Sequence, residues 1–383
     1  RKNKTKRDVA LILSEKVGTA AAVYTTNLVK GAPILVDMEN LADGKAQAII
    51  VNSGNANTCN ADGVEKAMQM CKIAARQCAV LPSNVIVAST GVIGMPLDVT
   101  PIEKSIGQLY WDLEHSVAGS RNAAEAIMTT DTTIKEVAVE FELGGKVCRM
   151  GGIAKGSGMI HPNLATMLIF ITSDIAISSE MLQKALKADV NKTFNMISVD
   201  GDTSTNDTVA IISNGMAGNK FINSEGEEYD VFCKALYMIT SKLCKMLAAD
   251  GEGATKLLEC IVTGGKDVQT AQTVAKSVIC SSLLKAAMFG ADANWGRVLC
   301  AIGYSGADVD INKIDVAFKS AKGELPVCKN GAGIPFSEEK AKEILLENEI
   351  DILINLNDGA SCATAWGCDL TYDYVKINGD YRT

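Results

Sequence analysis

The sequence predicts an α/β fold in which layers of sheet and helix pack against each other. Short runs of β-branched residues alternate with helix-patterned stretches along most of the chain. The 383 residues are 47% apolar and 21% charged, a composition that is ordinary for a globular protein and allows a substantial core. We therefore expect two or three domains or one two-lobed body, with mixed or antiparallel sheets because hairpins are present.

The first half of the chain contains the clearest alternation of strands and helices. A helix over residues 60–80 would place Val64, Met68, Cys71 and Cys78 on one face. A helix over residues 100–117 is expected to be capped by Thr100, with Pro101 in its first position. Strands are expected at residues 7–15, 19–26, 46–54 and 83–90, and a hairpin that turns at Gly144-Gly145 is expected over residues 135–155.

The second half continues the same pattern. The helix over residues 226–250 carries an apolar stripe, and the C-terminal stretch is too rich in Trp and Tyr for a disordered tail, so it is expected to fold back onto the body. Strands are expected at residues 166–174, 207–215, 255–265, 314–320, 325–331 and 349–357. Helices are expected at residues 178–194, capped by Ser178 or Ser179, and at 226–250, 267–290 and 292–306.

Composition excludes several classes of function. The net charge is −8 and no basic block follows the first seven residues, which argues against nucleic acid as a partner. No apolar run approaches the roughly 18 residues that a membrane span needs. The twelve cysteines form no CxxC pair and the two histidines are His115 and His161, so no metal site is expected. We expect a cytoplasmic protein with reduced, buried cysteines and no cofactor.

The stretch "KGSGMIHPNLATMLIFITSD" places a glycine-rich approach and a His-Pro-Asn turn directly before a buried strand that begins at Thr166. A P-loop is excluded because Lys155 precedes Gly156 and a strand, not a helix, follows. His161, in a turn before a proline, is more often a surface residue than a catalytic base. The remaining interpretation concerns Thr166 itself.

Thr166 would become a nucleophile if the chain were cut before it. A free α-amino group has a pKa of about 7.7–8.0, which suits a general base at neutral pH. Cutting the Ala165–Thr166 bond would place that amine beside the hydroxyl of its own residue, so no histidine is needed. The same hydroxyl can make the cut by attacking the carbonyl of Ala165, helped by strain in the preceding turn.

Three further stretches each have a structural interpretation, and two of them also have a functional one. The turn "STGVIG", Ser89 to Gly94, follows a buried strand; Gly91 would let a backbone N–H face a cavity as an oxyanion hole requires, although alone it reads as a strand-ending turn. "MTTDTT" is hydroxyl-rich and alone reads as a turn or helix-cap cluster. Glu252, in "ADGEGATK", could bind a substrate ammonium or lie in a plain helix C-cap.

Taken together, these motifs resemble the ornithine acetyltransferase family, the glutamate N-acetyltransferases of arginine biosynthesis. The matching stretches are "ASTGVIG", "MTTDT", "KGSGMIHPNLATML", "GEGATK", "NWGR" and "ATAWGCDLTYDYVKINGDYRT", and they occur in the family's order over nearly the whole chain. The resemblance implies the layered α/β sandwich of self-processing aminopeptidases with a second, smaller α/β lobe. It also implies two cleaved pieces, residues 1–165 and 166–383, in an α2β2 heterotetramer.

The resemblance also assigns roles to residues. It implies cleavage between Ala165 and Thr166, with Thr166 as the nucleophile and Thr90 and Gly91 as the oxyanion hole. It implies that the substrates contact Thr129, Lys155, Thr166, Glu252, Asn378 and Thr383.

The implied reaction moves an acetyl group from N2-acetyl-L-ornithine to Thr166 and then to L-glutamate. Some members of the family also take acetyl-CoA as donor, and the sequence does not decide this point. Two other functions stay open. One is an amidase or aminopeptidase on the same fold that uses water as acceptor. The other is a non-enzymatic amino-acid-binding protein whose chain stays intact.

Overall fold

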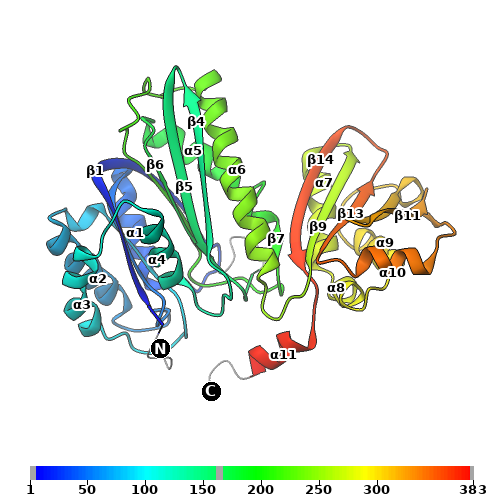
Figure 1. The fold of residues 1–383 in the computed structure, drawn as a ribbon, viewed down its shortest axis with the longest axis horizontal. Helices are drawn as coiled ribbons and strands as arrows, with labels where there is room; N and C mark the ends of the chain where they lie inside the picture. Colours follow the sequence, from blue (N-terminus) through cyan, green and yellow to red (C-terminus); the bar gives the residue numbers. More distant parts are fainter. Residues whose placement is uncertain (1–5, 161–166, 380–383) are drawn as a thin grey trace. The chain divides into compact units, whose positions relative to one another are not determined.

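The structure is a computed structural model that describes residues 6–160 and 167–379. This part of the chain divides into two compact units, drawn as a ribbon in Figure 1, and each unit carries its own seven-stranded mixed sheet. The predicted α/β class with two lobes is therefore confirmed. Unit 1 contains the described residues up to Gly156, those from 167 to Asn191, and Thr203–Leu243. Unit 2 contains the described residues from Ser157 to 160, Lys192–Asp202, and the described chain from Cys244 onward.

The sheet of unit 1 has the strand order β3-β2-β1-β8-β6-β5-β4. Its neighbouring strands are antiparallel except for the pairs β2–β3 and β6–β8, which are parallel. The predicted β4–β5 hairpin is present and turns at Gly144 and Gly145, both with positive φ. The strands are β1 (Val9–Tyr24), β2 (Lys45–Asn52), β3 (Val85–Ser89), β4 (Lys135–Leu143), β5 (Lys146–Lys155), β6 (Leu168–Ser173) and β8 (Thr208–Ser213).

Strand β1 is bent, and the bend folds the sheet into two layers. We expected two strands at residues 7–15 and 19–26, but the chain forms one strand whose register with β2 shifts between Leu13 and Gly18. A Cβ on Gly18 would lie 2.6 Å from the carbonyl oxygen of Ser213, so glycine is required for this approach to β8. Figure 1 shows β1 arching from its pairing with β2 to its pairing with β8.

Apolar cores cover both faces of the β2 strand. One core contains Ile49 and Val51 of β2 with Phe170 of β6, and it also receives side chains from β3, β5, β8 and α4. The other core contains the alternate residues Ala48 and Ile50, packed with α1, α2 and α3. Because both faces of this strand are covered, its sequence is a nearly continuous apolar run.

The helices of unit 1 match the predictions in part. The sequence analysis predicts neither α1, which is short, nor α4, which is rich in small residues. The predicted cap of α3 is wrong, because Thr100 is already helical and donates its backbone N–H to Asp98 Oδ1. The predicted face of α2 is confirmed for Cys71, which is buried, and for Met68 and Cys78, which pack against the same core, but it is wrong for Val64, which is exposed. The helices are α1 (Ala32–Asn40), α2 (Gly63–Cys78), α3 (Thr100–Trp111), α4 (Val117–Ile127), α5 (Ser179–Val190) and α6 (Glu227–Ala249), within which the unit boundary falls.

Two predictions about α5 and α6 are confirmed. The Ser178 hydroxyl oxygen caps α5 by accepting the backbone N–H of Met181. Ile239 and Leu243 lie where a Cβ on Gly152 of β5 would meet them, so α6 packs closely on that strand. The apolar stripe of α6 is fully buried at Phe232, Leu236, Ile239, Leu243 and Leu247.

Unit 2 is built on a second mixed sheet, in the order β12-β11-β10-β13-β9-β14-β7. The helix predicted over residues 267–290 is two helices, because Ser281 ends the first and its hydroxyl caps the second. The strands are β7 (Ile197–Ser198), β9 (Leu257–Gly265), β10 (Asp315–Ser320), β11 (Gly323–Lys329), β12 (Ala332–Gly333), β13 (Glu349–Asn355) and β14 (Ser361–Cys368). The helices are α7 (Val268–Cys280), α8 (Ser282–Phe289), α9 (Trp295–Gly303), α10 (Glu338–Leu345) and α11 (Tyr372–Gly379).

The C-terminal stretch and the cysteines test two further predictions. Strand β14 lies between β9 and β7, so the C-terminal stretch folds onto the sheet as expected. The twelve cysteines are free, but the prediction that they are buried is wrong for Cys59, Cys300 and Cys362, which are exposed. Within residues 6–160 and 167–379, no helix has the length and apolar character to cross a membrane.

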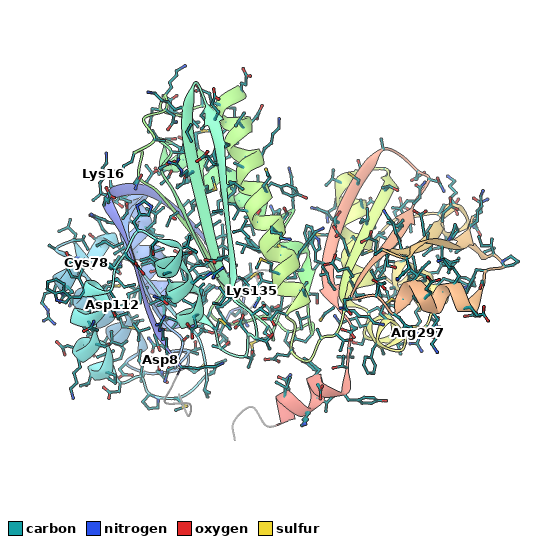
Figure 2. The ribbon with its side chains drawn as sticks, viewed as in Figure 1. Asp8, Lys16, Cys78, Asp112, Lys135 and Arg297 are labelled. Atoms are coloured by element: carbon teal, nitrogen blue, oxygen red, sulfur yellow. The ribbon has the colours of Figure 1, made fainter. Side chains whose placement is uncertain are left out.

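A buried ion pair holds the start of β4. Lys135 Nζ lies 2.7 Å from Asp131 Oδ1, both side chains are inaccessible to solvent, and Figure 2 shows Lys135 at this end of β4. Burial alone would raise the pKa of Asp131, but the charges of Lys155 and Lys135 and hydrogen bonds outweigh burial and lower this pKa from 3.8 to about 2. A carboxylate with a lowered folded-state pKa stabilises the fold above its unfolded pKa, and this contribution disappears as pH falls through the folded value.

We predict that Asp131→Asn lowers the free energy of unfolding at pH 7 by ~3–5 kcal/mol, because it breaks a buried ion pair. The difference from the wild type should narrow as pH falls from about 4 towards about 2, where Asp131 becomes protonated. Urea unfolding of both proteins, at pH 7 and at pH values between about 4 and about 2, measures this difference in the free energy of unfolding. Glu140→Gln removes one partner of the exposed Arg149–Glu140 pair and should cost less than ~1 kcal/mol. A similar loss in both variants would contradict the prediction.

Candidate active site

The turn that follows β3 has a backbone shape that only glycine permits. Gly91 has φ 133°, and a Cβ there would lie 3.0 Å from the backbone nitrogen of Asn55. The preceding residue, Thr90, is buried and donates its backbone N–H to the Asn52 carbonyl at 2.9 Å. Both predicted oxyanion residues are therefore held in a fixed turn.

Asn206 ties this turn to the chain that enters β8. Its Nδ2 donates to the carbonyls of Ala56 at 2.6 Å and Ser89 at 2.9 Å, and its Oδ1 accepts the Thr58 hydroxyl at 2.6 Å. All of these groups are buried or belong to buried residues. Asn206 thus joins the end of β3 to the start of β8, two places that the bend in β1 brings together.

Lys155, the last residue of β5, points to the same turn. Its side chain is buried, and Nζ lies 3.5 Å from Thr90 Oγ1. The two residues line a small gap, which has no room for a water molecule, together with Met167, Leu168, Asn206 and Asp207. The structure therefore brings together two predicted site residues, Thr90 and Lys155, from strands far apart in the sequence.

Asp131 fixes the backbone around two other predicted residues. Its Oδ2 accepts the N–H of Thr129 at 3.0 Å, and its Oδ1 accepts the N–H of Gly156, the residue after Lys155, at 2.6 Å. With the Lys135 ion pair, this carboxylate binds groups on three segments. The hydroxyl-rich run "MTTDTT" is therefore organised by its one acidic residue, which the sequence analysis did not single out.

Asp207 holds the described chain directly after residue 166. Its Oδ1 accepts the N–H of Met167 at 2.9 Å. Complete burial raises the pKa of Asp207 well above its usual range, although the Met167 N–H and the charge of Lys155 act in the opposite direction. Sequence analysis missed both Asn206 and Asp207. The polar run "STND" directly before a buried strand was the pattern that could have indicated them.

In unit 2, Glu252 and Asn378 form a second polar group. Asn378 Nδ2 donates to Glu252 Oε2 at 2.8 Å, and Glu252 lies between α6 and β9, as predicted. A Cβ on Gly158 would overlap the Glu252 carboxylate, so glycine leaves room for this side chain. Both predicted residues are therefore in contact with each other.

Asp200 anchors the described chain that precedes residue 161. Its carboxylate accepts the backbone N–H groups of Met159 at 2.5 Å and Ile160 at 2.9 Å. Burial raises the pKa of Asp200, and these backbone hydrogen bonds oppose the rise. Met159 has a φ of 55°, a backbone conformation that residues other than glycine seldom adopt. The remaining predicted positions, Ala165, Thr166 and Thr383, lie outside the described residues, as does His161.

Comparison with known proteins gives consistent matches over the whole chain. Residues 1–383 match the ArgJ family. The "Arginine biosynthesis bifunctional protein ArgJ" of Caldanaerobacter subterraneus subsp. tengcongensis is 52% identical over 99% of this chain and 94% of its own length. "Arginine biosynthesis bifunctional protein ArgJ 1" of Clostridium acetobutylicum is 50% identical over 100% of this chain and 93% of its own.

A solved structure supports the same assignment. The crystal structure of arginine biosynthesis bifunctional protein argJ from Bacillus halodurans is 47% identical, with a TM-score of 0.52, and the match covers 55% of this chain and 97% of that chain. Because the family match spans every residue and the curated relatives match over nearly their full length, the chain belongs to the ArgJ family.

Proposed function

We propose that this chain transfers the acetyl group of N2-acetyl-L-ornithine to L-glutamate in arginine biosynthesis, after cleaving itself between Ala165 and Thr166. The observation that carries the proposal is the cluster of side chains around Lys155 in unit 1. It places Thr90 and Lys155, two positions assigned by the family resemblance, beside Met167, the residue that follows Thr166. No metal or organic cofactor takes part in the proposed reaction.

The reaction has two halves that share one nucleophile. The Thr166 oxygen attacks the acetyl carbonyl, and the α-amine of Thr166 takes the hydroxyl proton and passes it to the departing nitrogen of ornithine. The Thr90 hydroxyl and the Gly91 N–H stabilise the oxyanion. L-Glutamate then attacks the acetyl-threonine ester through its own amine, which restores the Thr166 hydroxyl.

Charged groups would select the substrates. Lys155 would pair with the α-carboxylate that both substrates carry, with Thr129 as a further contact. Glu252 would bind the δ-ammonium of the donor, with Asn378 and Thr383 as further contacts. Water must be excluded from the acetyl-enzyme, because hydrolysis would waste the acetyl group.

The sheet of unit 1 is compatible with two pieces that stay together after cleavage. The piece that begins at Thr166 would have 218 residues (383 less 165). In unit 1, β6 and β8 from this second piece lie between β1 and β5 from the first, so the two pieces would stay joined by the sheet. We propose that they form an α2β2 assembly in the cytoplasm.

We predict that Thr166→Ala abolishes both cleavage and acetyl transfer, whereas Thr166→Ser retains slow cleavage because it keeps a hydroxyl. Denatured intact mass of the purified protein over time measures cleavage. The wild type should give pieces of 165 and 218 residues, the second beginning Thr-Met-Leu-Ile. A wild-type chain that stays whole and forms no acetyl-enzyme would refute the mechanism. Glutamate-independent loss of acetyl would instead indicate the amidase.

The oxyanion turn offers a matched pair of substitutions. Gly91→Ala should lower kcat by ~100-fold or more, because it disturbs an oxyanion donor and brings a Cβ against the Asn55 backbone. Gly94→Ala, in the same turn with φ 77° and no atom within 4 Å of the added Cβ, should leave kcat within about 3-fold at a stability cost of ~1 kcal/mol. Steady-state acetyl transfer measures both, and equal losses would argue against the oxyanion role.

A substitution at Glu252 separates donor binding from acceptor binding. Glu252→Gln keeps an oxygen for the Asn378 side chain but removes the charge, so the KM for N2-acetyl-L-ornithine should rise ~10-fold or more. The KM for L-glutamate should not rise, because its side chain carries no ammonium. Initial rates with each substrate varied in turn test this. An equal increase in both KM values would show that Glu252 has only a structural role.

A further inference from the structure

The oxyanion turn, residues 89–94, runs alongside the loop of residues 52–58 in unit 1. A Cβ on Gly91 would lie 3.0 Å from the backbone nitrogen of Asn55, so the turn and the loop are in close contact. The position of the loop therefore determines where the proposed oxyanion donors of Thr90 and Gly91 lie. Three backbone hydrogen bonds join the two segments, from the Thr90 N–H to the Asn52 carbonyl at 2.9 Å, from the Ala56 N–H to the Val92 carbonyl at 3.2 Å and from the Gly94 N–H to the Thr58 carbonyl at 3.0 Å.

One buried amide side chain binds both the turn and the loop. It belongs to Asn206, in the chain that enters β8, and this residue is 6% exposed. Its Nδ2 donates one hydrogen to the carbonyl of Ser89 in the turn, at 2.9 Å, and the other to the carbonyl of Ala56 in the loop, at 2.6 Å. Its Oδ1 accepts the hydroxyl of Thr58, also in the loop, at 2.6 Å. Because Ser89 directly precedes Thr90, the amide joins the two segments where the oxyanion donors begin.

We propose that Asn206 is a positioning residue for the oxyanion hole. By fixing the separation of the turn and the loop, its amide places the Thr90 hydroxyl and the Gly91 N–H, and it acts through the backbone of both segments. This inference rests on the proposed function and adds to it the group that orients the oxyanion donors. Such donors stabilise a developing oxyanion at about 2.7–3.1 Å from it, so a small shift of the turn would slow the reaction while substrate still binds.

A neutral amide suits this role better than a charged group does. A carboxylate of the same shape would lack both N–H donors and would place a negative charge near the oxyanion turn. Asn206 also lines the small gap beside Thr90 and Lys155, which has no room for a water molecule. Water therefore cannot enter this gap and take over the hydrogen bonds of the amide, so the geometry of the turn depends on the side chain itself.

The other end of β3 offers a matched control for this residue. Asn40, the last residue of α1, is 8% exposed, and its Nδ2 donates to the carbonyl of Val85, the first residue of β3, at 2.9 Å. The Asn206 amide holds the carbonyl of Ser89, the last residue of the same strand. Asn40→Ala and Asn206→Ala therefore remove the same group from opposite ends of one strand, and only the second removal lies next to Thr90.

The experiment compares Asn206→Ala, Asn40→Ala and the wild type, each well below its own melting temperature. Acetyl transfer normalised to cleaved protein gives kcat and KM. Asn206→Ala should lower kcat by ~10-fold or more, with the KM for N2-acetyl-L-ornithine within about 3-fold, because the oxyanion exists in the transition state and not in the bound substrate. Asn40→Ala should lower the melting temperature and keep kcat within about 3-fold. A wild-type kcat in Asn206→Ala, or equal losses of kcat in both variants, would overturn the proposal.

A milder pair of variants decides the question if Asn206→Ala fails to fold or to cleave. Thr58→Val removes the hydroxyl that Asn206 Oδ1 accepts, and Thr240→Val removes an equally buried hydroxyl that bonds to the Leu236 carbonyl within α6. Thr58→Val should lower kcat by ~5-fold and Thr240→Val should not, and equal kcat values in these two variants would refute the proposal.

The proposed function and the role of Asn206 fail separately. A wild-type chain that neither cleaves nor transfers acetyl removes the proposed function. An active wild type whose kcat is unaffected by Asn206→Ala removes the role of Asn206 alone.

Discussion

The bend in β1 is the constraint on which the rest of unit 1 depends. The pairing register places the end of β3 at the start of β1, because Val9 of β1 pairs with Asn52 of β2, which in turn pairs with Ser89 of β3. It places the start of β8 at the other end of β1, because Tyr24 pairs with Thr208. The bend near Gly18 folds one sheet into two layers and brings these ends together. The Asn206 side chain then bonds to the Ser89 carbonyl across the layers. Without the bend, the side chains of Thr90 and Lys155 would not meet.

Three carboxylates in units 1 and 2 accept hydrogen bonds from backbone N–H groups: Asp131 and Asp207, which are buried, and Asp200, which is half-buried. Asp131 has two lysines and two backbone N–H groups around it, and its pKa is lowered. Asp200 accepts backbone N–H groups, whereas Asp207 accepts one backbone N–H and is acted on by a single lysine, Lys155; in both, burial outweighs these effects and raises the pKa. The difference lies in the neighbouring cations, because backbone N–H groups alone do not offset the loss of hydration here. The backbone groups that the last two hold, at Met159 and Ile160 for Asp200 and at Met167 for Asp207, flank in sequence the bond that we propose is cleaved.

Sequence analysis predicted the helices and strands that follow from the spacing of apolar and glycine residues. It missed features that depend on the local backbone geometry at single residues. The buried stripe of α6 and the Gly-Gly hairpin followed directly from spacing. The continuity of β1 did not, because Gly18 indicates a strand boundary in sequence but serves as a bend in the fold. The break at Ser281 was hidden because both flanking stretches are good helix formers, so only the cap geometry separates them.

For the candidate site, the resemblance supplied Thr90 and Lys155, while Asn206, Asp207 and Asp131 emerged only from contacts. Their roles are to hold other groups, and a single sequence gives no pattern for a residue whose partner is a distant backbone N–H. This asymmetry has a physical basis. A nucleophile with its own amine as base needs few catalytic side chains, so most of the precision must come from groups that position backbone. In this fold those groups are short, buried amides and carboxylates at strand ends, where the register of the sheet determines what they contact.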